Sequence, residues 1–508
     1  MVRLSTSALV LSLIRLSVSR PFVSRQDDSV SVELDGVTYV NKGLVGFGFI
    51  PSDFRESTGD TLGGIGSAIA FKQGTYQILP NGSVTGIMVV HPDRGFNVDG
   101  TVDYQARQFE INFLLNPYYG SDNLDFEDAQ KTVQLTYLRT ILQFDRNNTK
   151  STGLDALGVR PAQSGFPALA IADPAMPIAS KKDPRLTIDA EGLVANSDGS
   201  YWVSDEYGPY IYRFDASGQL IQTIQPPAAI LPMDDDGNLS FTSEDDPATG
   251  RTGNQGFEGL TLDPINNVLY AMLQSATIQD GGDDKSTSRF TRLVAYDVSD
   301  PIATRPSLIG EWVVPLPISN SKGNTRACSE IHFVSPGVFL ALSRDGDGRG
   351  GDDTESKYKN ADLFSIAGAT DIHGTKFDDP SNPIAKKGKL DKSITPAEYV
   401  AFVSYIDDDE LARFGLHNDD PDDQTLIDAK WESLALAPVG DPDFPDDYFL
   451  FTFADNDFLT TNGFSLGVPY DAGLDVDNQV LVFRLTLPSV NPQSVEMALG
   501  ISASYSKV

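Results

Sequence analysis

Residues 191–206 read Glu-Gly-Leu-Val-Ala-Asn-Ser-Asp-Gly-Ser-Tyr-Trp-Val-Ser-Asp-Glu, and this segment carries the clearest structural pattern in the chain. An apolar run follows Glu191, an Asp-Gly pair interrupts it, and a second run alternates around Tyr201 and Val203. Short apolar runs separated by Asp-Gly are typical of antiparallel strands joined by a tight turn. A third run follows at residues 210–215. The segment therefore predicts three consecutive strands of one sheet.

A glutamate in the same local setting recurs along the chain. In each copy the acid precedes a small or apolar residue and then an apolar run, and the four acids are Glu191, Glu258, Glu330 and Glu432. A repeated sheet unit predicts a radial array, and an acid at the same point of each unit predicts carboxylates near a common axis. We therefore expect an all-β fold, a β-propeller with carboxylates around its central channel.

The repeats are longer than a compact blade. Successive glutamates are 67, 72 and 102 residues apart, whereas a blade needs roughly 40–50 residues. The excess falls in polar insertions at residues 233–256, 279–288, 346–359 and 378–395. Earlier segments fit the unit less well but also predict strands, so we expect six or seven blades with long loop insertions.

Composition supports a large β protein and excludes some partners. The chain has 508 residues, 40% of them hydrophobic, with 44 glycines and 31 prolines that indicate many turns. Its formal net charge of −33 repels phosphate backbones and anionic lipids, so we expect no nucleic-acid partner and no membrane contact. The single cysteine, Cys328, excludes an intramolecular disulfide and a cysteine-based zinc cage, and we expect it to be buried.

The N-terminus predicts a secretory signal peptide over residues 1–19. Arg3 supplies the positive region, residues 4–14 the apolar stretch, and Ser17-Val-Ser a small-x-small cleavage site. We expect an N-terminal extension at residues 20–40, the propeller domain at residues 41–490 and a C-terminal tail at residues 491–508. No later segment approaches the ~20 apolar residues that span a bilayer.

These features predict a secreted, extracellular monomer. Three Asn-x-Ser/Thr sequons begin at Asn81, Asn147 and Asn238. In a secreted chain they would accept glycans, so we expect a glycoprotein.

The recurring acids predict a calcium site on the axis. The candidate metal ligands are Glu191, Glu206, Glu258, Glu330, Glu432, Asp455 and Asp457, with Asp205 and Asn456 beside them. Calcium takes six to eight oxygen ligands, and buried carboxylates that face one another take up protons unless a cation lies between them. In the alternative interpretation, each glutamate accepts hydrogen bonds from backbone amides of the neighbouring blade and stitches the ring together.

A cation at this position could activate water and polarise a phosphoryl or carbonyl oxygen. The candidate catalytic residues are Glu191, Glu258, His332 and Arg344. His332 lies two residues after Glu330, so strand alternation places both on one face and makes His332 the candidate general base among the histidines. Arg344, with Lys430 and Arg94, could hold a substrate anion. Arg344 and Arg94 could equally form structural ion pairs.

Residues 345–350, Asp-Gly-Asp-Gly-Arg-Gly, imitate the start of a calcium-binding EF-hand loop. Arg349 stands at the third ligand position, and Ser356 stands where the bidentate glutamate should be. We therefore expect a surface turn here rather than a calcium loop.

Several motifs together resemble one family. The pattern of residues 191–218, the Gly-Phe-Glu-Gly-Leu-Thr-Leu of residues 256–262, and the segments 342–346, 430–434 and 454–458 resemble the phytase-like (esterase-like activity of phytase) domain family in its secreted fungal type. The first motif is also similar to the Glu-Gly-Pro opening of gluconolactonase-type and paraoxonase-type calcium propellers, with Leu193 in place of the proline. The resemblance covers roughly residues 40–490 and implies a propeller with ester-hydrolysing activity.

Two hypotheses follow. The first is a secreted, calcium-associated propeller hydrolase acting on a phosphoester or a carboxylic ester. The second is a non-catalytic extracellular binding propeller in which calcium is structural, because fold alone does not determine function.

Overall fold

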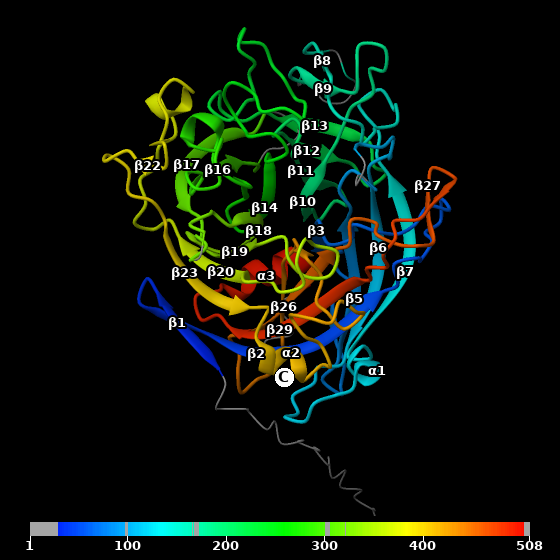
Figure 1. Cartoon of the computed structure of the whole chain (residues 1–508). Coiled ribbons are helices and arrows are strands. Elements are labelled where there is room, and N and C mark those ends of the chain that lie inside the picture. Colours follow the sequence, from blue (N-terminus) through cyan, green and yellow to red (C-terminus); the bar gives the residue numbers. More distant parts are fainter. Residues whose placement is uncertain are drawn as a thin grey trace, which may run out of the picture.

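Five antiparallel sheets of four or more strands make up most of the described chain (Figure 1). The computed structural model describes residues 29–96, 100–164, 166, 172–299, 305–320 and 322–501. The predicted signal peptide therefore lies outside the described residues. The sheets surround a common centre, each with one strand innermost, and they are called blades 1 to 5 in the order of those innermost strands.

Blades 1 to 4 are each built from consecutive strands. Blade 1 contains β3 (Ala68–Phe71), β5 (Val84–His91), β6 (Arg107–Leu115) and β7 (Val133–Leu142), and β4 (Gln77–Ile78) pairs with β5. Blade 2 contains β10 (Ala190–Ala195), β11 (Tyr201–Asp205), β12 (Ile211–Phe214) and β13 (Leu220–Ile224). Blade 3 contains β14 (Phe257–Asp263), β15 (Val268–Leu273), β16 (Phe290–Asp297) and β17 (Ser307–Pro315), and blade 4 contains β18 (Ala327–Ser335), β19 (Val338–Arg344), β20 (Lys359–Ser365) and β23 (Glu398–Ser404).

Blade 5 closes the ring by joining the two ends of the chain. Its strands are β24 (Lys430–Trp431) and β25 (Ala435–Pro438), which both pair with β26 (Asp447–Asp455), then β29 (Asn478–Thr486), β2 (Val37–Ile50) and β1 (Val30–Leu34). The outer strands thus come from the N-terminus and the inner ones from the C-terminal part. Residues 30–40, expected as an extension, supply strands of this blade.

The prediction of an all-β propeller is confirmed, but the structure has five blades, not six or seven. Two causes explain the difference. First, the strands near the two termini share one blade. Second, three small two-stranded sheets lie outside the blades: β8 (Gly158–Arg160) with β9 (Met176–Ile178), β21 (Ala385–Lys386) with β22 (Lys389–Leu390), and β27 (Gly463–Ser465) with β28 (Val468–Tyr470).

Apolar side chains fill the spaces between blades. One buried cluster joins blades 1 and 2, a second joins blades 2 and 3, a third joins blades 3 and 4, and the largest joins blades 4, 5 and 1. Each sheet is therefore covered on both faces. This explains why strands such as β11 are buried at every residue instead of alternating.

The short helices lie at the ends of the blades or outside them. They are α1 (Phe126–Ala129), α2 (Asp408–Ala412) and α3 (Pro492–Leu499), with two 3-10 turns at Ile278–Asp280 and Lys376–Asp378. Helix α3 packs against β25, and Figure 1 shows it near the centre of the ring. Within the described residues, none of the helices has the length and apolarity needed to span a bilayer.

The glycine of the Glu-Gly motif allows the inner strands to pack closely. A Cβ atom added at Gly192 would lie 2.4 Å from the Cβ atom of Leu260 on β14, and one at Gly259 would lie 2.9 Å from the backbone nitrogen of Ile331 on β18. No larger residue fits either position without moving the next blade. The motif is therefore a packing requirement of the ring.

Candidate functional site

The recurring glutamates stand at the start of the innermost strands, as the repeat predicts. The strand pairing shifts register at Glu191 on β10, at Glu258 on β14 and just before Glu330 on β18. In blade 5 the inner strand is interrupted between β24 and β25, where Glu432 lies. Such β-bulges redirect a side chain away from regular alternation. They explain how successive blades can turn an acid toward one region.

Three carboxylates of blade 2 come together there. Asp189, Glu191 and Glu206 each offer one oxygen, and these oxygens lie within 4.8 Å of one another. The three residues are only 1%, 6% and 2% exposed. The backbone N–H of Glu206 donates to the carbonyl oxygen of Asp189 at 3.0 Å, which holds the two segments side by side. We call these three residues the blade-2 carboxylates.

The blade-2 carboxylates lack enough protein donors to satisfy them. Asp189 Oδ1 and Glu206 Oε1 are buried without a hydrogen-bond partner, and so is Glu258 Oε2 in the next blade. Arg94 partly compensates Asp189, with Nη1 3.2 Å from Oδ2. Burial, and then the charges of the neighbouring acids, raise the pKa of Glu191 and of Glu206 well above the usual range. Such a group is stable only when protonated or when a cation lies among its oxygens.

Glu258 extends this cluster toward blade 5. Burial first, and then the charge of Glu432, raise the pKa of Glu258 to about 8. Its charge in turn raises the pKa of Glu191 and Glu206, so the three carboxylates are neighbours. Gln274 donates to Glu258 Oε1, which leaves Oε2 for another ligand.

A second group of acids already contains a cation. Oxygens of Asp93, Asp455 and Asp457 also lie within 4.8 Å of one another. The Nζ atom of Lys430 donates to Asp455 Oδ2 at 2.7 Å and to Asp457 Oδ1 at 2.6 Å. Burial alone would lower the pKa of Lys430, but the two aspartates raise it well above its usual value. The structure thus places Asp455 and Asp457, expected as metal ligands, around a lysine ammonium.

Two further predicted ligands also have protein partners. Glu330 Oε1 accepts backbone N–H groups of Leu260 at 2.9 Å and of Ile331 at 2.7 Å, so this glutamate stitches blade 4 to blade 3. Glu432 forms an ion pair with Arg344. For Glu330 the geometry matches the alternative interpretation of the repeat, and for Arg344 it matches the structural ion pair.

The remaining polar residues predicted beside the cluster serve as local supports. Asp205 Oδ1 accepts the N–H of Asp189 at 2.9 Å, and Oδ2 accepts the hydroxyl of Tyr212 at 3.0 Å. Asn456 Oδ1 accepts the N–H groups of Gly64 and Phe458 at 3.0 and 3.1 Å. Both residues position the backbone around the acids.

His332 lies away from the carboxylate cluster. As strand alternation predicts, it shares one face with Glu330, and both line a central cavity between the inner strands. Burial lowers the pKa of His332 to about 4, and no acid of the cluster contributes to that shift. The structure does not bring this candidate base to the blade-2 carboxylates.

The loop that imitates an EF-hand also holds a lysine. Lys359 Nζ donates to the backbone carbonyls of Asp347 at 2.5 Å and Ala429 at 2.8 Å, and lies 3.4 Å from Asp345 Oδ1. Asp345 Oδ2 accepts the N–H groups of Lys357 and Tyr358. The Lys359 ammonium therefore supplies the positive charge inside this loop.

Sequence reasoning missed Asp189 and Asp93. Asp189 precedes Glu191 by two residues. If the bulge at Glu191 had been known, this spacing would have indicated that the two side chains lie together. Asp93 stands beside Arg94 in a short polar segment that has no repeat to mark it.

Comparisons with known proteins give one family and one close relative. A family model described as "Phytase-like: Esterase-like activity of phytase" matches residues 83–420. An "Uncharacterized secreted protein" of Arthroderma benhamiae is 39% identical over 462 residues, which cover 84% of this chain and 89% of that protein. A solved luciferin-regenerating enzyme is 9% identical to this chain. The match covers 85% of this chain and 94% of that enzyme, and its TM-score of 0.28 is too low to support an argument.

Proposed function

The chain belongs to the phytase-like (esterase-like activity of phytase) family, and from this premise we propose that it is a secreted, calcium-associated hydrolase of a phosphoester or a carboxylic ester. One observation carries the proposal. The blade-2 carboxylates lie together, and two of their oxygens, like Oε2 of the neighbouring Glu258, are buried without a hydrogen-bond partner. A donor set made only of oxygens suits calcium.

The residues that would hold the ion are Asp189, Glu191 and Glu206, with Glu258 beside them. Calcium takes six to eight oxygens, so water and substrate would complete the set that these side chains begin. When bound, the ion would supply a Lewis acid that polarises the ester oxygen and activates a water molecule.

Glu258 is the side chain best suited to move a proton. Its pKa, raised to about 8 by burial, lets it exchange a proton near neutral pH. It would accept a proton from the attacking water as the new bond to carbon or phosphorus forms. It would then return that proton to the leaving alcohol as the ester C–O or P–O bond breaks.

Two cations flank the acids and would orient the substrate. Arg344 and Lys430 keep 14% and 26% of their side chains exposed, whereas their partners Glu432 and Asp455 are 5% and 0% exposed. Both cations are ion-paired, to Glu432 and to Asp455 and Asp457. Their positive charge would therefore reach a substrate without either side chain leaving its partners.

Secretion is supported by two observations. The related chain of Arthroderma benhamiae is named a secreted protein. The predicted glycan acceptors Asn81, Asn147 and Asn238 are all exposed and lie outside the strands, where a glycan could be attached.

The second candidate is a binding propeller with structural calcium. It is favoured by the near-complete burial of Asp189, Glu206 and Glu258, at 1%, 2% and 3% exposure. An ion enclosed in this way would have little room for a substrate.

Chelation separates the two. The purified protein would be assayed with phytate and with 4-nitrophenyl esters, with calcium and after exhaustive EDTA treatment. A catalytic ion predicts turnover that chelation abolishes and calcium restores, and Glu258→Gln should lose at least 100-fold in kcat while calcium still binds. Asp128→Asn, an exposed acid, is the matched control. No turnover of any ester, with chelation changing only thermal stability, would contradict the hydrolase and support the binding propeller.

A further inference from the structure

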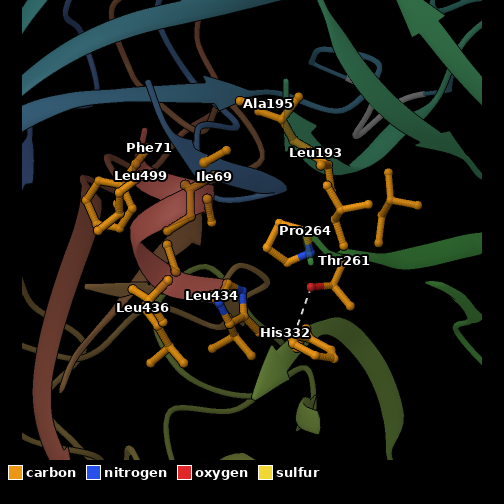
Figure 2. A pocket seen from close by; sticks show the side chains of 18 of the residues that line it. Ile69, Phe71, Leu193, Ala195, Thr261, Pro264, His332, Leu434, Leu436 and Leu499 are labelled. Atoms are coloured by element: carbon orange, nitrogen blue, oxygen red, sulfur yellow. Dashed lines mark hydrogen bonds between the residues drawn. The ribbon is translucent and has the colours of Figure 1, made fainter. Parts of the chain in front are cut away.

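The central channel contains a second feature, separate from the acids. A cavity of about 100 Å³ lies between the inner strands of the five blades (Figure 2). It is lined by later residues of those strands, including Ile69, Leu193 and Leu436, with Val495 and Leu499 of helix α3 along one side. The inner strands begin at the acid cluster and end at this cavity, so the two occupy different levels of one axis.

The lining is mainly apolar, and several of its polar atoms already have hydrogen-bond partners. Thr261 Oγ1 accepts the N–H of Phe333 at 2.8 Å, a bond drawn in Figure 2. Ser494 Oγ donates to the carbonyl oxygen of Asn491 at 2.7 Å, and Glu330 Oε1 accepts two backbone N–H groups. These side chains are thereby fixed in place.

His332 is one lining side chain that keeps hydrogen-bonding capacity. One ring N–H bonds to the backbone of Leu434, and within the described part of the chain the other nitrogen has no hydrogen-bond partner. Protein surrounds the ring, yet it keeps accessible surface, because that surface faces the cavity. Its pKa of about 4 keeps the ring neutral at physiological pH, so the second nitrogen is an acceptor.

The size and chemistry of the cavity limit what can enter. A water molecule needs roughly 10–15 Å³ of such space and two to four polar partners, whereas apolar cavities near 150 Å³ stay dry and bind small aromatic molecules. A mainly apolar lining with an imidazole acceptor suits an apolar molecule with one hydroxyl donor. Access is available beside α3, because Ala498 lines the cavity and is also exposed to solvent.

We propose that this cavity is a binding site for a small apolar molecule carrying one hydroxyl group, which donates to the free ring nitrogen of His332. The site goes beyond the proposed ester hydrolysis and does not depend on it. It requires neither calcium nor the blade-2 carboxylates.

Calorimetric titration of the full chain with phenol, and separately with toluene, tests the proposal. Phenol should bind saturably with one equivalent, and EDTA should not alter the affinity. His332→Leu should weaken phenol binding about 5- to 20-fold, the effect of one hydrogen bond, and toluene binding less than about 3-fold. Ala498→Trp, at an exposed position beside the opening, should abolish binding of both. Met497→Ala, on the same helix and away from the cavity, is the matched control.

Three results would overturn the proposal. These are no saturable binding of either probe, unchanged affinity in Ala498→Trp, or an equal loss of phenol and toluene affinity in His332→Leu. Because neither probe is an ester and calcium is not needed, the outcome is independent of whether the protein is a hydrolase.

Discussion

Two acidic trios lie near the axis of this propeller, and they differ in one respect. Asp93, Asp455 and Asp457 have oxygens within 4.8 Å of one another, and so do the blade-2 carboxylates. In the first trio the Lys430 ammonium lies within 2.7 Å of two of the acids. In the second, two oxygens are buried without any partner.

The difference teaches that clustered acids alone do not define a metal site. Facing carboxylates that stay ionised require positive charge, but that charge can be part of the chain. In the first trio Lys430 supplies this charge, and Lys359 supplies it in the loop that contains Asp345. Neither place needs an added cation. Among the described residues the second trio has one ion-pair partner, Arg94, which also donates to Tyr207 and Ser243, so we expect it to depend on a cation from solution.

Removing the built-in cation should have the largest effect. Lys430→Met leaves two buried acids and the partly exposed Asp457 around an apolar side chain, so we expect a loss of about 3–5 kcal/mol in the free energy of unfolding. Guanidinium unfolding in EDTA measures it. Lys131→Met, which breaks an exposed pair with Asp128, should cost less than about 1 kcal/mol. A loss at Lys430 no greater than that of the control would show that the first trio does not need its ammonium.

Calcium should stabilise the protein through the second trio. At 100 times the dissociation constant, a ligand specific for the folded state adds about 2.7 kcal/mol. Thermal unfolding with calcium and with EDTA measures this gain, and Asp189→Asn should remove most of it. Asp455→Asn should lower stability but keep the response to calcium. If Asp455→Asn lost the response and Asp189→Asn kept it, the assignment of the two trios would be reversed.

The sequence predicts the repeat better than it predicts what each repeat does. The Glu-Gly-apolar pattern correctly indicated a propeller with acids at the start of its inner strands. It could not show that the fourth-blade glutamate, Glu330, accepts backbone amides, because that depends on a bulge and on the position of the next strand. It also could not pair Lys430 with Asp455 and Asp457, since that contact forms only when β24 pairs with β26.

The predicted number of blades was wrong for a similar reason. Counting repeats assumes that each blade is continuous in sequence. Here the closing blade pairs β2 with β29, which lies more than 400 residues later in the sequence. No local pattern in either strand indicates that pairing.

Glu258, beside the second trio, should also make stability depend on pH when calcium is absent. The pKa of Glu258 is about 8 in the folded protein, above its ordinary value, so the folded state binds this proton more tightly than the unfolded chain does. This contribution to stability is complete below pH of about 4.5 and is lost as pH rises through about 8. Denaturant midpoints in EDTA should therefore fall across this window, and Glu258→Gln should flatten the profile. A midpoint that rises with pH, or a mutant profile identical to the wild type, would be evidence against the buried acid.

The smallest effect is expected at Glu330. Glu330→Gln keeps an oxygen that can accept the amides of Leu260 and Ile331, so calcium affinity should change less than about 3-fold. Glu206→Gln removes a ligand charge and should weaken calcium about 10- to 100-fold. Isothermal titration compares the two, and equal losses would place Glu330 among the ligands.

The central claim is that one trio needs an ion and the other has its own. Anomalous X-ray diffraction from crystals grown with calcium tests this most directly. The account predicts one peak, about 2.3–2.6 Å from carboxylate oxygens of Asp189, Glu191 and Glu206, and none among Asp93, Asp455 and Asp457. No peak at the blade-2 carboxylates, or a peak with Lys430 displaced from its aspartates, would contradict it.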